Sequence, residues 1–385
     1  MLLKIETHRS GIFIFQIAID FERMQPLIDK VNYGHRLFSS LPLLPEIAAQ
    51  LERETLLSSI HGTDTIEGGT LTEDEILQVM ESAPEVNQEE HKLRIINLSR
   101  AYKFAEETAL QTLAEKRVFK VTELFIMQLH KMISTEINDE RYLPGQYRDN
   151  PKGKITKVGD AEHGGVYKPP QAHIDIKMLM GQLIEWMNSE PLCHLPSLIR
   201  APLAHYYFER IHPFQDGNGR VGRLLEKTIL IASGDKYASR GIDRYYLENI
   251  DNYFSAFNRS RNGEKTNPNT CNHEFVEFVI QGFSVTLERL HRRANKLMEH
   301  FLILAWLGDQ LRNKRINHRE HVILDYLGGQ STPINIVQIK SLPWYQELYR
   351  KYSGATESRD WSHMFNDGLI IKSVNGYLRL NAFRD

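Results

Sequence analysis

The sequence predicts a mainly α-helical protein, and three observations lead to this prediction. Apolar residues recur at helical spacing through long segments of the 385-residue chain, for example at Phe125, Leu129, Met132 and Ile133. One interval, residues 141–170, is so rich in glycine and proline that it rules out a helix. Strand-like patterns occur only in short pieces near the two ends and inside that interval.

The N-terminal part is expected to form a short β-hairpin followed by helices. Residues 1–20 contain two apolar runs around a His-Arg-Ser-Gly turn, which is the pattern of a hairpin. Residues 21–116 are mostly helical, and Thr72 with Glu75 makes a capping box that marks the start of one helix. An amphipathic helix is predicted over residues 118–137.

The middle of the chain is predicted to return to helices after the interval rich in glycine and proline. Within that interval, Ile155 to Val158 and Val166 to Lys168 are expected to pair as a small hairpin. Helices are then predicted from about His173, and over 196–211, 221–233, 246–260 and 273–312.

The C-terminal stretch differs from the rest in charge and in pattern. Residues 312–385 hold 11 Lys or Arg and 7 Asp or Glu, whereas the whole chain has a net charge of −2. Asn375-Gly376 is a strong hairpin turn between two short strands. The predicted order is three helices and two strands, at 318–327, 334–349, 356–367, 369–373 and 377–380. Three helices and a hairpin describe a winged helix-turn-helix.

The composition is that of a globular protein from a reducing compartment. Hydrophobic residues make up 41% and charged residues 25% of the chain, which is ordinary for a soluble protein. Cys193 and Cys271 are too few for a disulfide framework. The N-terminus lacks a cationic start with a long apolar stretch, and no run of eighteen apolar residues occurs. We therefore expect a cytoplasmic protein without a signal peptide or a membrane helix.

Residues 212–223, His-Pro-Phe-Gln-Asp-Gly-Asn-Gly-Arg-Val-Gly-Arg, concentrate the chemistry of the chain. Gly217, Gly219 and Gly222 formally match a dinucleotide-binding fingerprint. That site needs a strand before the glycines, and a helix precedes them here, so we reject this reading. The glycines still allow the backbone to approach a phosphate, and the N–H groups at a helix N-terminus bind anions.

The charged residues of the same run add two cations, a metal ligand and a base. Arg220 and Arg223 share one face of the following helix and suit a polyphosphate. Asp216 would repel a phosphate unless a cation such as Mg²⁺ bridged the two. An unperturbed histidine has a pKa of about 6.5, which suits a general base at neutral pH, and His212 is the histidine of this run. The run therefore predicts a site for phosphate transfer.

The run 212–223 resembles the signature of Fic-domain proteins, H-P-F-x-D/E-G-N-G-R-x-x-R, at every fixed position. The resemblance covers roughly residues 40–285. It implies a Fic-type helical bundle that transfers AMP from Mg·ATP to a hydroxyl of a target protein or of the chain itself. In this scheme His212 deprotonates the target hydroxyl and Asp216 holds Mg²⁺. The resemblance assigns the phosphates to Gly217, Asn218, Gly219, Arg220, Gly222 and Arg223.

Two further regions receive a role from the same resemblance. Leu143-Pro144-Gly145-x-x-Arg148 and the glycine-rich stretch after it look like the family's target-positioning flap. This flap would pair with an extended segment of the target by strand addition, through Ile155, Val158, Val166 and Tyr167. An adenine pocket is assigned to the aromatic residues Tyr253, Phe254 and Phe257, for which a place in the hydrophobic core is the simpler alternative.

Residues 63–68, Thr-Asp-Thr-Ile-Glu-Gly, resemble the family's inhibitory motif, S/T-x-x-x-E-G/N. Gly68 and Gly69 should end a helix, so that Glu67 lies in its last turn and opposes the helix dipole by about 0.3–1 kcal/mol. The resemblance gives Glu67 a partner in Arg223, at the position of the ATP γ-phosphate. Thr63 is expected to be a hydroxyl that supports the helix.

The predicted domains combine these elements. They are an N-terminal region with the inhibitory helix, a Fic catalytic core, a linking helix and a winged helix-turn-helix, at 1–110, 111–285, 286–311 and 312–385. A homodimer is compatible with the sequence, which gives no residue-level argument for it.

Three alternatives remain open at this point. The same site could transfer another phosphate-containing group or remove AMP. The chain could also be a transcriptional regulator that binds DNA through its C-terminal domain and uses the Fic core as a sensor. A zinc site at His205, Glu209 and His212 is disfavoured, because no further ligand cluster accompanies this helical stripe.

Overall fold

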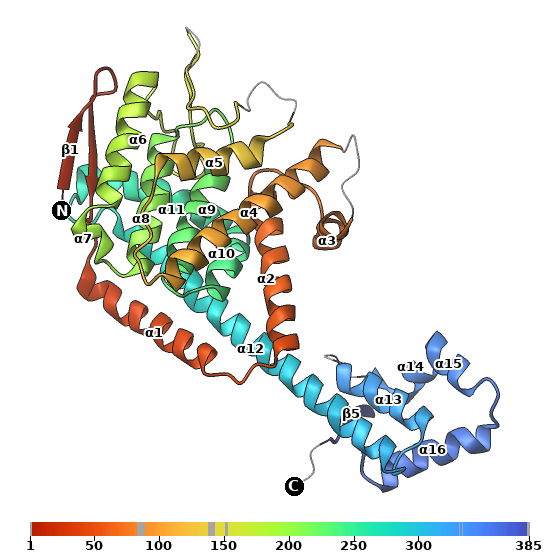
Figure 1. Ribbon diagram of the computed structural model, residues 1–385. Helices are drawn as coiled ribbons and strands as arrows, with labels where there is room; N and C mark the ends of the chain where they lie inside the picture. The colour runs from red at the N-terminus through yellow and green to blue at the C-terminus, as the bar shows by residue number, and fades with distance from the viewer. Residues whose placement is uncertain are drawn as a thin grey trace. The chain divides into compact units, whose positions relative to one another are not determined.

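The computed structural model describes residues 2–82, 89–137, 143–150, 153–330, 332 and 334–382. These residues form two compact units, 1–291 and 292–385, and the boundary falls within helix α12 (His273–Arg312). The mainly helical class predicted from the sequence is confirmed (Figure 1). The finer division into four domains stays a prediction.

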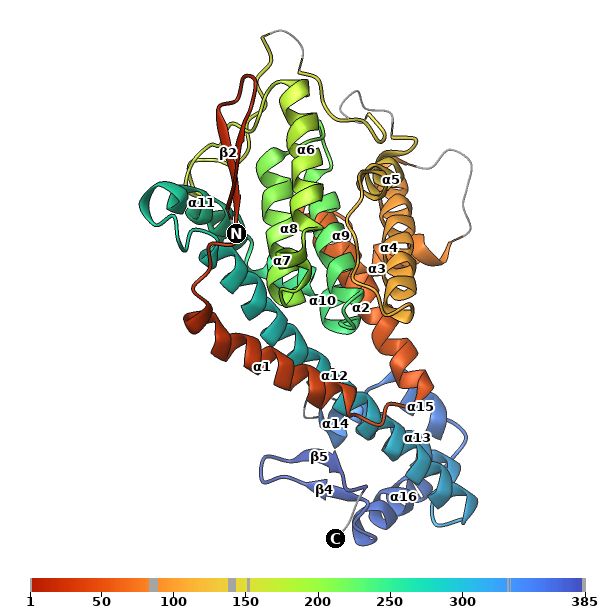
Figure 2. The same ribbon diagram turned by 60° about the vertical axis from the view of Figure 1, so that its left-hand side comes forward.

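The first unit begins with the predicted hairpin. Strands β1 (Leu2–Glu6) and β2 (Ile12–Gln16) pair antiparallel, with Leu2 opposite Gln16 and Glu6 opposite Ile12. The side chain of Asp175 accepts hydrogen bonds from the backbone N–H groups of His8 and Arg9 in the turn, at 2.9 and 3.0 Å. Because Asp175 belongs to α6, the hairpin is fixed beside that helix, as two views show (Figures 1 and 2).

Helices make up most of the remaining first unit. Up to the glycine-rich interval they are α1 (Phe21–Ser39), α2 (Pro45–Ile66), α3 (Glu73–Glu81), α4 (Glu90–Ala114) and α5 (Glu123–Ser134). After it come α6 (His173–Met187), α7 (Glu190–Cys193), α8 (Ser197–Ile211), α9 (Asn218–Ile231), α10 (Tyr237–Glu248) and α11 (Ile250–Thr266), followed by α12. The predicted capping box of Thr72 and Glu75 is present at the start of α3.

Helices α8 and α9 lie side by side in the middle of this unit and are buried on nearly all sides. Polar residues of α9 are enclosed with the apolar ones, including Arg220, Arg223, Glu226 and Lys227. A buried charge is costly unless it is paired or hydrogen-bonded. The centre of the unit is therefore where polar side chains have been retained at a cost in stability, which is typical of functional sites.

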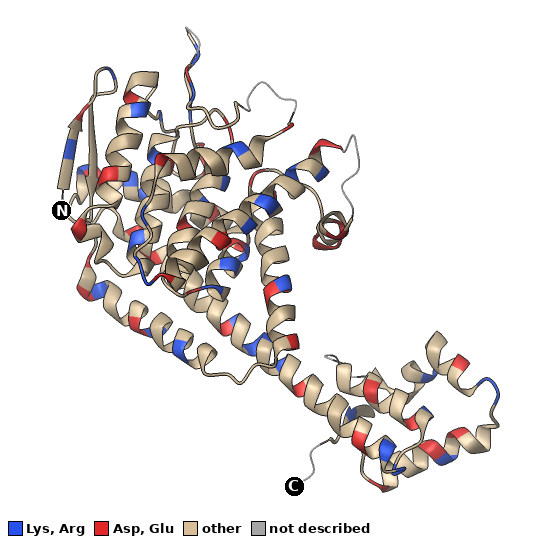
Figure 3. Ribbon diagram, viewed as in Figure 1, with Lys and Arg blue, Asp and Glu red and all other residues tan. Residues whose placement is uncertain are grey.

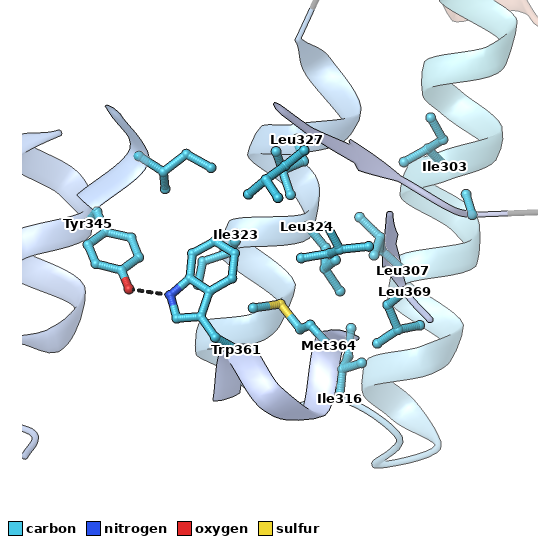
Figure 4. Close-up of a cluster of buried hydrophobic side chains, with 14 of the residues drawn as sticks. Ile303, Leu307, Ile316, Ile323, Leu324, Leu327, Tyr345, Trp361, Met364 and Leu369 are labelled. Carbon is cyan, nitrogen blue, oxygen red and sulfur yellow. Dashed lines mark hydrogen bonds between the residues drawn. The ribbon is translucent and has the colours of Figure 1, made fainter. Parts of the chain in front are cut away.

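The second unit contains α13 (His318–Gly329), α14 (Ile336–Lys340), α15 (Pro343–Tyr349) and α16 (Gly354–Asn366). Strands β3 (Ile334–Asn335), β4 (Ile370–Lys372) and β5 (Tyr377–Leu380) form an antiparallel sheet in the order β3-β5-β4. Its core is a cluster that includes Leu324 and Met364 (Figure 4). The indole N–H of Trp361 donates to the hydroxyl of Tyr345 at 2.7 Å within that cluster.

Some predicted elements differ from the observed ones. The helix expected over 334–349 is a short strand and two helices, because Asn335 caps α14 and Pro343 starts α15. Helix α10 was not predicted as a separate element, and α9 starts at Asn218 rather than near Val221. The expected flap hairpin is reduced to one bridge between Val158 and Tyr167. Parts of the predicted elements at 83–88 and 151–152 lie outside the described residues.

Candidate active site

The loop from His212 to Gly217 leaves α8 and enters α9 through two left-handed residues. His212 ends α8 with φ 50° and ψ 61°, a conformation that is uncommon outside glycine. Gly217 has φ +80°, and a Cβ at this position would come within 2.9 Å of Cδ1 of Ile133. Any other residue there would be strained in its backbone and would have to displace the side chain of Ile133. The sequence therefore folds this loop into one defined shape.

Two buried side chains hold the loop. The amide of Asn218 donates to the carbonyl of Phe214 and accepts from its N–H, both at 2.9 Å. The guanidinium of Arg148 donates to the carbonyl of His212 at 2.7 Å and to the carbonyl of Pro170. Burial lowers the pKa of Arg148 to about 10, so that it is still a cation at neutral pH. The left-handed His212 is thus tied to the end of the flap by one side chain.

His212 has the geometry that a general base requires. Its Nδ1 lies 3.2 Å from Oε2 of Glu209, one helical turn earlier. An ionised carboxylate can only accept, so Nδ1 carries the proton and Nε2 is left with the lone pair. The side chain is 19% exposed, which leaves the ring accessible.

His130 supports the loop from α5. Its Nδ1 accepts from the backbone N–H of Gly145 at 3.0 Å, and its Nε2 lies 3.1 Å from the carbonyl of Asp216. This pattern assigns the proton to Nε2. The ring stacks on Phe214 with centroids 3.7 Å apart. Burial lowers the pKa of His130 to about 4, so the imidazole is neutral at physiological pH.

The two arginines predicted to bind phosphates lie in the first two turns of α9. Arg220 donates to Oδ1 of Asp216 at 2.8 Å. The Nε of Arg223 donates to the hydroxyl of Thr63 at 2.6 Å, and its NH2 group donates to Oε1 of Glu67 at 2.7 Å. Both guanidinium groups are almost fully buried. Thr63 therefore contacts Arg223 directly, beyond the helix support expected of it.

Glu67 lies against the N-terminal turn of α9. Helix α2 ends at Ile66, with Glu67 as its C-cap and Gly68 in the left-handed conformation at φ +86°, as the glycine pair predicts. A Cβ added at Gly219 would collide with Oε1 of Glu67. Burial alone would raise the pKa of Glu67, but Arg223 and Arg220 outweigh it and hold the pKa below its usual range. A carboxylate thus takes the place where a helix N-terminus binds anions.

The other predicted residues are more dispersed. Gly222 packs against α8, where a Cβ would meet Cδ2 of His205 at 2.7 Å. Tyr253 is buried, and its hydroxyl lies 3.3 Å from Arg223 and 3.2 Å from Nε2 of His205. Phe254 is half-buried against the ring of His163, a flap residue. Aromatic residues of α11 therefore reach both Arg223 and the flap.

The flap carries exposed apolar side chains. Ile155 and Val166 are more than half exposed, and the backbones of Val158 and Tyr167 exchange two hydrogen bonds. The Tyr167 hydroxyl donates to the carbonyl of Arg210 at 2.9 Å, which joins the flap to α8.

The donor atoms suit a metal ion that is held partly by its substrate. Within the described ranges, no group of three or more His, Cys, Asp or Glu residues is arranged to bind a metal. Asp216 supplies one carboxylate beside the helix N-terminus. Mg²⁺ takes one or two protein carboxylates and completes its shell with phosphate oxygens and water. The residues therefore fit Mg²⁺ in complex with a polyphosphate.

Sequence reasoning missed the roles of two residues. Glu209 was weighed only as a zinc ligand, although its position three residues before His212 is a signal that the two side chains contact each other. His130 had no signal in the sequence, because it lies 86 residues from Asp216 and meets it only in the folded chain.

Comparisons with known proteins agree with this geometry. The sequence model of the Fic/DOC family matches residues 120–230. The protein adenylyltransferase Fic of Drosophila ananassae is 29% identical over 223 residues, which are 56% of this chain and 39% of that protein. The protein adenylyltransferase Fic of Drosophila virilis is 30% identical over 186 residues, which are 48% of this chain and 34% of that protein. The matched region thus spans well under half the length of these relatives.

Solved structures share the fold. A Fic family protein from Desulfovibrio desulfuricans aligns with a TM-score of 0.56 and 17% identity, over 94% of this chain and 97% of that one. A Fic domain-containing signaling protein from Bacteroides thetaiotaomicron aligns with a TM-score of 0.55 and 23% identity, over 71% and 96%. Residues 120–230, which include the loop from His212 to Arg223, thus match the Fic/DOC family in sequence, and the chain shares its fold with these structures.

Proposed function

We propose that the protein transfers AMP from ATP to a hydroxyl side chain of a protein and that Glu67 restrains this activity. One observation carries the proposal: a base, a carboxylate and an anion-binding helix N-terminus meet in residues 212–223, with Glu67 lying on that N-terminus. The relatives named protein adenylyltransferase Fic support the choice of AMP as the transferred group.

The residues divide the work of the reaction. Nε2 of His212 accepts the proton of the target hydroxyl, while Glu209 keeps the ring in the required tautomer. The hydroxyl oxygen forms a bond to the α-phosphorus as the bond to pyrophosphate breaks. Backbone N–H groups at the start of α9, with Arg220 and Arg223, hold the phosphates and stabilise the developing charge. Mg²⁺ bound through Asp216 would neutralise phosphate charge.

Glu67 acts as a brake because it competes for the same cation. Its ion pair with Arg223 occupies the group that a γ-phosphate needs, and its charge repels a phosphate at the start of α9. The lowered pKa keeps the carboxylate ionised at neutral pH. The ion pair is fully formed above the ordinary pKa of a glutamate and is lost only as the pH falls through the lower folded value. The brake therefore holds throughout the physiological range.

The flap is proposed to place the target. The backbone around Val158 and Tyr167, with the exposed Ile155 and Val166 beside it, suits strand addition by an extended segment. The chain itself is a candidate target.

We assign the protein to the cytoplasm, because Cys193 and Cys271 are free thiols. No helix within the described ranges is long and apolar enough to cross a membrane.

The test is incubation of three proteins with Mg²⁺ and ATP labelled at the α-phosphate, followed by intact mass. Glu67→Gly should gain AMP, wild type much less, and Glu67→Gly/His212→Ala none. Label in Glu67→Gly from α-labelled but not γ-labelled ATP separates AMP transfer from phosphoryl transfer. Absence of label in Glu67→Gly, with ATP binding retained, would contradict AMP transfer and favour AMP removal or another donor.

A second function is proposed for the C-terminal unit, on a separate observation. The helices and the sheet order β3-β5-β4 support a winged helix-turn-helix, in which α16 would be the recognition helix. Ser358, Arg359 and Ser362 on α16 are exposed. Lys372 is the last residue of β4, before the turn that joins β4 to β5 and would form the wing. A gel shift with duplex DNA at increasing salt tests this. Binding that weakens steeply with salt supports a DNA-binding regulator, and no shift argues for a protein-binding domain.

A further inference from the structure

A cavity of about 880 Å³ lies beside the flap, away from the loop 212–217. Its walls are the turn of the N-terminal hairpin, the segment that leads from the flap into α6, and the start of α6. These elements lie next to one another in both ribbon views (Figures 1 and 2). Nothing in the proposed AMP transfer uses the hairpin, so this cavity needs its own explanation.

Three of the cations that line the cavity have no side-chain partner among the described residues. Arg9, Lys154 and Lys168 are exposed, and within the described residues their side chains make no hydrogen bond or ion pair. Asp149 is the single acidic residue among the described lining residues. Elsewhere in the chain basic and acidic residues are interspersed (Figure 3). Charges of one sign gathered around a cavity attract a ligand of the opposite sign.

Apolar surface accompanies these cations. Ile12 and Ile174 line the same cavity and are 67% and 54% exposed. Exposed apolar side chains beside a concave surface are typical of sites that bind other proteins. Single-stranded nucleic acid would instead need exposed aromatic rings for its bases, whereas Phe13 in this lining is buried and Tyr167 is half-buried with its ring against the guanidinium of Arg210. The mixture of cations with aliphatic side chains and prolines fits a peptide with acidic and apolar residues.

The cavity is built before any ligand binds. Asp175 in α6 holds the hairpin turn through the N–H groups of His8 and Arg9 and through the hydroxyl of Ser10. Arg210 also lines the cavity, and its guanidinium pairs with Glu264 and lies over the rings of Phe13 and Tyr167. A preformed site loses less free energy on ordering when it binds its ligand.

The cavity is also joined to the active site. Lys168 follows Tyr167, whose backbone pairs with Val158 in the flap. Pro170 lines the cavity, and its carbonyl shares the guanidinium of Arg148 with the carbonyl of His212. The flap therefore runs directly into the cavity wall, and one guanidinium holds both Pro170 in that wall and the backbone of His212.

We propose that this cavity docks an acidic, apolar-containing extended segment of the protein substrate, next to the residue that is modified. The proposal rests on the proposed function and specifies the class of its substrate. Arg9, Lys154 and Lys168 contact the acidic side chains, and Ile12 and Ile174 contact the apolar ones. The charge of the cavity thereby selects the target. Strand addition at the flap uses main-chain hydrogen bonds, which do not depend on the target's side chains.

The experiment measures peptide binding without nucleotide, so its result does not depend on AMP transfer. The probe is a fluorescein-labelled peptide in which Glu alternates with Leu around one Tyr, and its control peptide has Lys in place of Glu. Fluorescence anisotropy is recorded for wild type and for Lys154→Glu/Lys168→Glu. The control variant is Lys116→Glu/Lys265→Glu, which has the same change in charge at exposed lysines outside the cavity.

Wild type should bind the acidic peptide and not the basic one, and binding should weaken with salt. The cavity variant should lose about tenfold or more in affinity at low salt, while the control variant changes far less. Equal loss in the two variants, equal binding of the two peptides, or no binding by wild type would overturn the proposal. Tighter binding of a single-stranded oligonucleotide at the same lysines would also overturn it and assign the cavity to nucleic acid.

Discussion

At the scale of single residues, the loop 212–217 depends on a histidine that must stay neutral. His130 accepts at Nδ1 and reaches the Asp216 carbonyl through Nε2, so a second proton would break the contact with the N–H of Gly145. In the unfolded chain the same side chain takes up a proton near pH 6.5. Between that value and the folded pKa of about 4 the unfolded state binds more protons. Stability therefore falls as the pH is lowered through this range.

The first prediction follows from this difference. The free energy of unfolding should drop by about 3 kcal/mol between pH 7 and pH 4 because of His130 alone. Urea unfolding of wild type and of His130→Gln, each across this pH range, measures it as the difference between the two curves. Parallel curves for the two proteins would mean that His130 is not the group that titrates.

The second prediction concerns Arg148, which donates to the carbonyls of His212 and Pro170. Lysine has a single donor head and cannot hold both carbonyls in a fixed geometry. Arg148→Lys, in a Glu67→Gly background, should lower kcat for AMP transfer by about tenfold to a hundredfold and leave the KM for ATP nearly unchanged, because the base is misplaced while the phosphate site stays intact.

A matched control for Arg148 exists in the chain. Arg200 is also buried and donates to two backbone carbonyls, those of Phe119 and Met187, but it lies outside the loop. Arg200→Lys should cost similar stability and leave kcat unchanged. If both variants lose kcat in proportion to their loss of stability, Arg148 is a structural residue and does not position His212.

The residues of the loop could be predicted from the sequence because they are adjacent in it. His212, Asp216 and Arg220 lie four residues apart in sequence, so their chemistry can be predicted from spacing. The contacts of His130 and Arg148 join segments that are far apart in the sequence. No local pattern encodes such a contact, and only the packing of α5 and the flap against the loop brings these residues there.

At the scale of secondary-structure elements, the position of Glu67 depends on how α2 is held. Gly62 of α2 packs so closely on α10 that a Cβ there would come within 2.8 Å of the carbonyl carbon of Asp243. The hydroxyls of Ser59 and Tyr102 both donate to Oδ2 of Asp243 at 2.6 Å, and Lys227 of α9 forms an ion pair with it. Helices α2, α4, α9 and α10 thus meet at one buried carboxylate.

The third prediction is that Ser59→Ala weakens the proposed inhibition by Glu67, although the hydroxyl of Ser59 bonds to Asp243 and not to Glu67 or Arg223. Loss of one hydrogen bond to a charged group should destabilise the packing of α2 on α10 by about 1.5–3 kcal/mol. Each 1.4 kcal/mol raises the fraction of molecules with α2 detached about tenfold. Automodification should therefore rise toward the level of Glu67→Gly. Ser58→Ala is the control, because the neighbouring Ser58 hydroxyl makes no hydrogen bond among the described residues.

The activity assay with labelled ATP, run on both serine variants, separates the outcomes. A rise with Ser59→Ala alone supports α2 docking as the control of the brake. Equal activity in the two variants would show that the contact between Glu67 and Arg223 holds without help from Asp243. A rise in Ser59→Ala/Glu67→Gly above Glu67→Gly itself would place the effect of Ser59 outside the brake.

Element boundaries were predictable where local chemistry sets them. Gly68 ends α2 and the Thr72 capping box starts α3, and both signals are in the sequence. The prediction of one helix over 334–349 was wrong, because pairing with β5 holds Ile334 and Asn335 in strand β3. Pairing with residues 377–378 is a tertiary effect, which overrides the helical pattern of that stretch.

At the scale of the whole molecule, the two compact units have separate cores. The unit 1–291 encloses residues such as Met180 of α6, and the unit 292–385 encloses Met364 in its own cluster. Both methionines are fully buried, so substituting either one with alanine leaves a comparable cavity. A cavity of this kind costs about 2–5 kcal/mol in the unit that contains it. Units with separate cores can unfold in separate transitions.

The fourth prediction is that heating gives two transitions and that each methionine affects one of them. Met364→Ala should lower the melting temperature of the second unit alone, and Met180→Ala that of the first alone. Calorimetry measures both. Trp186 is the tryptophan of the first unit, so fluorescence of a Trp186→Phe variant follows Trp306, Trp344 and Trp361 in the second. A single transition shifted equally by both substitutions would mean that the continuous helix α12 makes the chain unfold as one cooperative unit. AMP transfer by Met364→Ala, assayed between the two melting temperatures, should then persist only if the transitions are separate.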